Sequence, residues 1–104
     1  MVIEYIRYRI PPDDVETFVQ AYERAALSLD AAPNCLGYEL ARCVEEPDRF
    51  ILRIHWDSVE GHMSGFRGSE PFREFFSHVR PYVDAIEEMQ HYEATPVASS
   101  GFAS

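Results

Sequence analysis

The order of apolar patterns along the chain is the feature that constrains its fold most. Residues 2–10 and 49–56 alternate apolar and other side chains with a period of two, as strands do. Apolar residues at helical spacing follow each of these stretches, and a further strand pattern follows each helical stretch. The chain is therefore predicted to fold as strand, helix and strand in each of two similar halves, residues 2–44 and 49–93.

Prolines and short polar residues mark where these elements begin and end. Pro11 and Pro12 end the first strand, because proline has no N–H for a sheet ladder. Asp13 followed by Glu16 has the pattern of a capping box, which predicts that the first helix begins at Asp13. Turn residues at 45–48 predict a hairpin between the two halves.

Two shorter helices are predicted in the second half of the chain. Ser58 and Ser69 stand where their N-caps are expected. Gly61 and Gly65 lie in the first of these helices, and each costs about 0.5–1 kcal/mol of helix stability relative to alanine. We therefore expect residues 59–68 to form a mobile lid.

This order of elements predicts an α+β, ferredoxin-like fold of the split β-α-β type. Right-handed crossovers would place the helices on one face of a four-stranded antiparallel sheet. The opposite face mixes apolar and charged side chains, and two such faces packed together would form a homodimer. We expect residues 1–93 to form this one domain and residues 94–104 to be a flexible tail.

Composition excludes several classes of function. All nine basic residues are arginine, so Schiff-base chemistry on a lysine amine is impossible. A net charge of −9 without a basic cluster argues against nucleic acid as a partner. No run approaches the roughly 20 apolar residues of a membrane span. Two cysteines without metal-like spacing favour a reduced, cytoplasmic protein.

Three residues are candidates for catalysis. His62 is the candidate general base, because imidazole titrates near neutral pH and helical spacing directs this residue inward. The alternative is a buried histidine that a backbone carbonyl satisfies. Trp56 and Tyr8 are expected beneath the helices, where an indole would stack on a flat substrate and a phenol would bind a substrate oxygen. Both residue types also serve in a core without any function.

Five further side chains are candidates for binding a substrate, with core packing or a solvated surface as the alternative for each. Arginine would hold an anionic group, and the many aromatic side chains would line a cleft for an aromatic ligand. The candidates are Tyr38, Phe66, Arg67, Phe72 and Phe76. No metal and no other cofactor is expected, because the histidines show no tight ligand spacing. They are His55, His62, His78 and His91.

Three segments of the second half resemble the antibiotic-biosynthesis monooxygenase family. They read RFILRIHWDS, FRGSEPFREFF and MQHYE, and APNCLGYEL carries the resemblance into the first half. Members of this family are dimeric ferredoxin-like α/β barrels, so the resemblance implies a homodimer. The family's heme-degrading members use an Asn on the first strand, a Trp on the short helix and a His on the next helix. The first strand here has no Asn, and the other two positions hold Phe66 and Phe76, which argues against heme degradation.

The resemblance implies a cofactor-independent monooxygenase that oxidises an aromatic, quinol- or anthrone-like molecule with O2. Such an enzyme needs an apolar pocket that excludes water, a general base and a polar group for the developing oxyanion. A non-catalytic ligand-binding or accessory module on the same fold is the alternative. A heme-binding protein is a third and less favoured interpretation.

Overall fold

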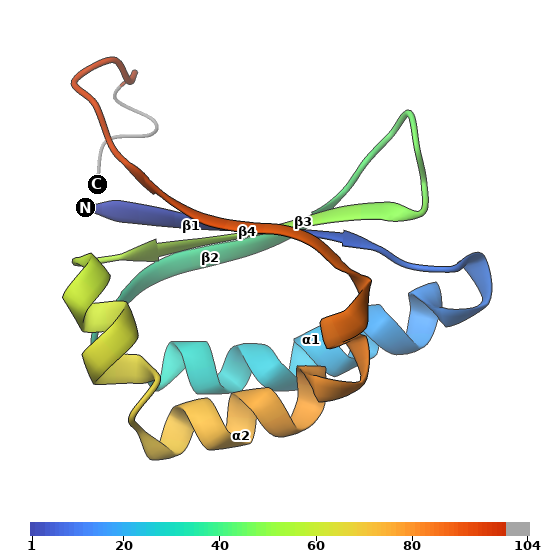
Figure 1. The fold of residues 1–104 in the computed structure, drawn as a ribbon, viewed down its shortest axis with the longest axis horizontal. Coiled ribbons are helices and arrows are strands. Elements are labelled where there is room, and N and C mark those ends of the chain that lie inside the picture. Colours follow the sequence, from blue (N-terminus) through green and yellow to red (C-terminus); the bar gives the residue numbers. More distant parts are fainter. Residues whose placement is uncertain (100–104) are drawn as a thin grey trace.

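The computed structural model describes residues 1–99 and contains one antiparallel sheet, with strands in the order β2-β3-β1-β4 (Figure 1). The strands are β1 (Val2–Arg9), β2 (Cys35–Arg42), β3 (Arg49–Trp56) and β4 (Ile86–Glu93). The helices are α1 (Val15–Asp30), the π-helical segment η2 (Gly61–Phe66) and α2 (Glu70–Val79), with short 3-10 segments η1 (Pro12–Asp14) and η3 (Arg80–Ala85). All of them lie on one side of the sheet (Figure 1), which confirms the predicted ferredoxin-like fold.

The first helix begins later than the capping box predicts. Pro12–Asp14 forms a 3-10 turn, so Asp13 lies inside that turn and not at a helix N-cap. Asp14 precedes α1, and its side chain makes no capping hydrogen bond. The predicted capping box of Asp13 and Glu16 is therefore wrong, because the two prolines start a separate turn before the helix.

The two predicted serine caps of the second half do bind backbone N–H groups. The N–H of Gly61 donates to Ser58 Oγ at 2.8 Å. The N–H of Phe72 donates to Ser69 Oγ at 3.3 Å, and Ser69 is the N-cap of α2. These bonds fix how the chain enters the two helical segments that cover one end of the sheet.

The core fills the space between the sheet and the helices. Phe18 of α1 and Trp56 of β3 are fully buried there, at 0% exposure. Alternation along the strands directs one set of side chains into this core. The other set lies on the opposite face of the sheet, which no helix among residues 1–99 covers (Figure 1) and which is the bare face. On the bare face, Arg7 and Glu88 form an ion pair at 3.2 Å, among half-buried apolar side chains. Among residues 1–99, no helix is long and apolar enough to cross a membrane.

The glycines of η2 face a neighbouring loop. A Cβ on Gly61 would collide with Asp57 Oδ1, and a Cβ on Gly65 would collide with Asn34 Oδ1. Asn34 Nδ2 in turn donates to Asp57 Oδ2 at 2.8 Å. Close packing of η2 on this loop therefore accounts for the two glycines, and the mobile lid over residues 59–68 stays a prediction.

Candidate active site

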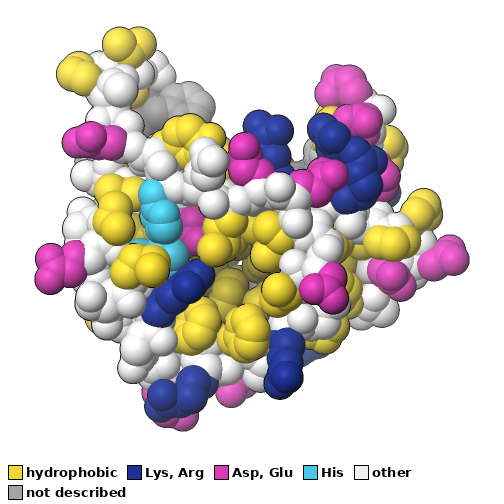
Figure 2. All heavy atoms as spheres, in the orientation of Figure 1, with side chains coloured by type: hydrophobic (Ala, Val, Ile, Leu, Met, Phe, Trp, Pro, Cys, Tyr) yellow, Lys and Arg dark blue, Asp and Glu magenta, His cyan; other side chains and the backbone are white. Residues whose placement is uncertain are grey.

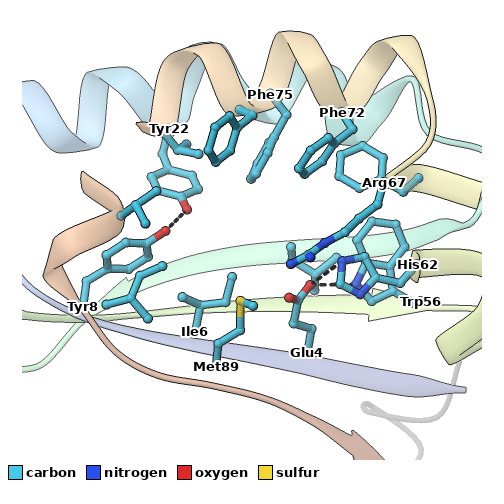
Figure 3. A pocket seen from close by; sticks show the side chains of 16 residues that line it. Glu4, Ile6, Tyr8, Tyr22, Trp56, His62, Arg67, Phe72, Phe75 and Met89 are labelled. Atoms are coloured by element: carbon cyan, nitrogen blue, oxygen red, sulfur yellow. Dashed lines mark hydrogen bonds and ion pairs between the residues drawn. The ribbon is translucent and has the colours of Figure 1, made fainter. Parts of the chain in front are cut away.

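A cavity of about 360 Å³ lies between the sheet and α2. Figure 2 shows it as a hollow below β4, walled by hydrophobic side chains, with histidine at one end. Aliphatic and aromatic side chains from the sheet, α2 and η3 make most of its wall, among them Ile6, Ile54, Phe75, Val79, Val83, Ile86 and Met89. Polar groups lie at its two ends (Figure 3). The cavity can therefore enclose an apolar molecule that carries polar groups at its ends.

A buried carboxylate stands at one end of the cavity. Glu4 of β1 is only 2% exposed, and its side chain lies on the apolar face of the sheet. The indole Nε1–H of Trp56 donates to Glu4 Oε1 at 3.0 Å, and His62 Nε2 lies 3.4 Å from the same oxygen (Figure 3). The imidazole stacks on the indole of Trp56, with ring centroids 4.6 Å apart and planes 14° apart. Because both contacts involve Oε1, Glu4 Oε2 is left for a ligand in the cavity.

A second histidine continues this chain of contacts. His91 is the partner of Glu4 in the register between β4 and β1, so the two side chains are neighbours on the same face. His91 Nε2 lies 2.7 Å from His62 Nδ1. Glu4, His62 and His91 therefore form one row of polar contacts that runs from the cavity to the edge strand, with a hydrogen bond between the two histidines and a contact of 3.4 Å between His62 and Glu4.

Burial shifts the titration of this row. Desolvation raises the pKa of Glu4, although the Trp56 N–H and the charges of His91 and Arg67 oppose the rise. Desolvation, together with the charges of His91 and Arg67, lowers the pKa of His62 to about 4. His62 is thus neutral at pH 7 and a weaker base than free imidazole, whereas the carboxylate of Glu4 is a stronger base than an exposed one.

Two tyrosines form the opposite end of the cavity. The hydroxyls of Tyr8 and Tyr22 are hydrogen-bonded to each other (Figure 3). Desolvation raises the pKa of Tyr8 to about 12 and that of Tyr22 well above its usual value, so both are neutral phenols at pH 7. The pair has two O–H protons and uses one between its members, which leaves one to donate to a ligand oxygen.

The structure brings most of the sequence-derived candidates to this cavity. Seven of them line it: Tyr8, Trp56, His62, Phe66, Arg67, Phe72 and Phe76. Tyr38 does not reach it, because β2 is the opposite edge of the sheet from β4. Its hydroxyl donates to Asp30 at 2.9 Å, and it borders a separate depression beside α1.

Two residues of this site, Glu4 and His91, were not predicted from the sequence, and Tyr22 was considered only as an aromatic wall or core residue and not for its hydroxyl. Glu4 alternates in phase with the apolar residues of the first strand, so the sequence could have indicated that this carboxylate lies on the buried face. Tyr22 fits an apolar helix stripe, so its hydroxyl contact gave no signal. His91 is 29 residues from His62 in the chain, and only the pairing of β4 with β1 brings it close.

The row contains the donor types of a metal site, which the spacing of the histidines did not indicate. Glu4, His62 and His91 each offer one ligand atom within 4.8 Å of the others. Two imidazoles and a carboxylate suit zinc or iron. Glu4 nevertheless faces Nε2 of His62 while His91 faces Nδ1, so the donors do not converge on one point. This geometry fits a row of pairwise contacts better than it fits one ion.

Comparison with known proteins gives the family. The sequence profile described as antibiotic biosynthesis monooxygenase matches residues 1–77. The uncharacterized protein YczJ of Bacillus subtilis is 25% identical over 93 residues, which cover 89% of this chain and 98% of YczJ.

Solved structures share the fold. A protein from Bordetella bronchiseptica named after the same family has a TM-score of 0.74 and 25% identity, covering 90% of this chain and 96% of that one. SnoaB from Streptomyces nogalater, described as a cofactor-independent oxygenase, has a TM-score of 0.73 and 15% identity, covering 89% of this chain and 91% of that one. The chain belongs to the antibiotic biosynthesis monooxygenase family.

Proposed function

We propose that the protein is a cofactor-independent monooxygenase that oxidises an electron-rich aromatic molecule of quinol or anthrone type with O2. The observation that carries this proposal is the apolar cavity of about 360 Å³ with a buried Glu4–His62 couple at one end. Its volume suits a small polycyclic molecule, and its largely apolar walls offer water few partners, so a bound substrate would displace water from the reacting atoms. The fold shared with SnoaB, which is described as a cofactor-independent oxygenase, supports the same class of reaction.

The proposed reaction needs two proton transfers, one from the substrate before O2 is reduced and one to the peroxide afterwards. Glu4 Oε2 takes a proton from the substrate, and the resulting anion gives one electron to O2. The substrate radical and superoxide combine, and the peroxide takes the proton back from Glu4. The hydroperoxide then loses water to leave a carbonyl, so one oxygen atom enters the product and the other leaves as water.

Other groups of the cavity stabilise the charges that develop. The guanidinium of Arg67 reaches the Glu4 end of the cavity (Figure 3) and would stabilise the substrate anion and superoxide. The free O–H of the Tyr8–Tyr22 pair would hold an oxygen at the far end of the substrate. Phe72 and Phe75 supply ring faces and edges for an aromatic ligand.

Oxygen uptake tests the proposal directly. Metal-stripped protein is assayed with a panel of hydroquinones and anthrones, beside Glu4→Gln and His62→Ala variants and a Tyr38→Phe control outside the cavity. We expect uptake by the wild type, unchanged uptake by Tyr38→Phe, and at least a tenfold loss in folded Glu4→Gln and His62→Ala. Binding of these compounds without any uptake would instead support the ligand-binding module.

We also propose that the protein is a homodimer that pairs through the bare face of the sheet. Half-buried apolar side chains on this face, among them Ile3, Tyr5 and Ile51, border a shallow depression. Arg49 forms ion pairs with Glu46 and Glu87, and Arg53 forms one with Glu39, but the buried Nε atoms of both arginines have no hydrogen-bond partner among residues 1–99. A second copy of the sheet would cover the apolar side chains and offer carboxylates to these arginines.

A further inference from the structure

We propose that Glu4, His62 and His91 form a proton path that joins the closed end of the cavity to solvent at the edge strand. This inference rests on the proposed function only for its role in turnover, because the path itself is a property of the resting protein. Glu4 and His62 are 2% and 3% exposed, whereas His91 is half-buried on β4. A proton on Glu4 therefore has a continuous route outward through two imidazoles.

When Glu4 is ionised, one arrangement of protons on the two imidazoles gives each N–H within the row an acceptor. Its Oε1 accepts from the Nε1–H of Trp56, and the Nε2–H of His62 faces the same oxygen at 3.4 Å. The Nδ1 of His62 is then bare and accepts from the Nε2–H of His91 at 2.7 Å. Every polar hydrogen between these groups has one acceptor.

A second arrangement satisfies the same contacts when Glu4 is protonated. Three proton transfers convert the first arrangement into the second. A solvent proton joins His91 Nδ1, and the Nε2 proton of His91 passes to His62 Nδ1. The Nε2 proton of His62 then passes to Glu4 Oε1. The reverse sequence returns one proton to solvent. Each imidazole gains a proton at one nitrogen and loses one at the other, so neither ring has to rotate or hold a charge.

The surroundings favour transfer through neutral rings. Stacking on Trp56 holds the His62 ring in place, with both of its nitrogens aimed along the row. Desolvation and the nearby Arg67 disfavour an imidazolium at His62, which opposes a trapped charge in the middle of the path. With a substrate in the cavity, a protonated Glu4 loses its Oε1 proton to solvent through this row, and only then can Glu4 act as the base. His91 is thus a positioning and relay residue that does not touch the substrate.

Nitrogen NMR of the histidine rings tests the path without any substrate. In protein labelled with 15N-histidine at pH 7, we expect His62 and His91 each to have a proton on Nε2 and a bare Nδ1. Different tautomers in the two rings, or an imidazolium at His62 at this pH, would overturn the path. Titration with ZnCl2 is run in parallel, and micromolar binding that is lost in His91→Phe would also overturn it in favour of a metal centre.

Turnover provides the second test. His91→Phe keeps a ring of similar size but cannot carry a proton, and His78→Phe on α2 is the matched control. We expect His91→Phe to lower kcat at least tenfold with little change in KM, and added imidazole to restore the rate in proportion to its concentration. Wild-type turnover by His91→Phe would overturn the path. If the wild type shows no oxygen uptake, the proposed function fails and the tautomers alone decide the path.

Discussion

The imidazole of His62 stacks on the indole of Trp56 at 4.6 Å, and both rings direct a nitrogen toward the same oxygen of Glu4. Trp56 ends β3, His62 lies on η2 and Glu4 lies on β1, so three elements meet at one carboxylate. A lone ionised carboxylate at 2% exposure would be costly to bury. The two ring N–H groups offset that cost and keep a reactive base beside an apolar cavity.

Acid should weaken the wild-type fold through His62. The unfolded chain protonates this histidine below about pH 6.5, but the folded protein does so only below about pH 4, so stability falls as pH falls through that window. Between pH 7 and pH 5 the loss from His62 is about 2 kcal/mol. Urea unfolding should therefore show a smaller difference between pH 7 and pH 5 in His62→Phe than in the wild type. Equal differences in both proteins would contradict the lowered pKa.

Glu4 should change the folding stability at acid pH in the direction opposite to His62. Its raised pKa means that the folded protein binds a proton at a higher pH than the unfolded chain, so protonation of Glu4 favours the folded state as pH falls. Removing this contribution in Glu4→Gln should make the acid loss of stability steeper than in the wild type. Urea unfolding of the two proteins at pH 7, 6 and 5 measures it. A shallower loss in Glu4→Gln would show that its pKa is not raised.

The fold and most of the cavity were predictable, and the row of titrating groups was not. Alternation placed Tyr8 and Trp56 beneath the helices, and helical spacing placed His62 with them, because each signal is local. The contact between His62 and His91 depends on which strands pair, since residues 29 positions apart meet through β1. Tyr38 shares the helix-facing side of the sheet with Tyr8, as predicted, but lies outside the cavity, because a shared face does not say how far apart two strands lie in a sheet.

The Tyr8–Tyr22 pair should act on substrate binding and not on the chemical step. Its hydroxyls are neutral at pH 7 and lie at the far end of the cavity from Glu4 (Figure 3). Tyr8→Phe should raise KM several-fold with little change in kcat, because only a ligand contact is removed. Tyr38→Phe removes a hydroxyl outside the cavity and should leave both constants unchanged. A tenfold loss of kcat in Tyr8→Phe would place this hydroxyl in the chemical step.

Close packing under η2 should make Gly61 intolerant of a side chain. A Cβ there would displace Asp57, which accepts hydrogen bonds from Asn34 and Ser58. Gly61→Ala should destabilise the protein by about 1 kcal/mol even though alanine favours helices. Gly37→Ala is the control, because its Cβ would meet nothing within 4 Å, and it should be neutral or slightly stabilising. Thermal unfolding compares them, and a gain of stability in Gly61→Ala would contradict the packing role.

Pairing of two sheets should depend on the apolar centre of the bare face. Ile51 lies there, half-buried, between β1 and β2 in the sheet order and opposite Arg7 and Ala41 in the register. A carboxylate in its place would be buried against its own copy across a two-fold interface, and like charges there oppose association. Ile51→Glu should therefore be a monomer by light scattering while its far-UV circular dichroism matches the wild type. Val44→Glu is the matched control, because Val44 is 87% exposed in the hairpin and its replacement should leave a dimer intact. A wild type that is monomeric at micromolar concentration would contradict the proposed pairing, and a dimer that survives Ile51→Glu would move the interface to another surface.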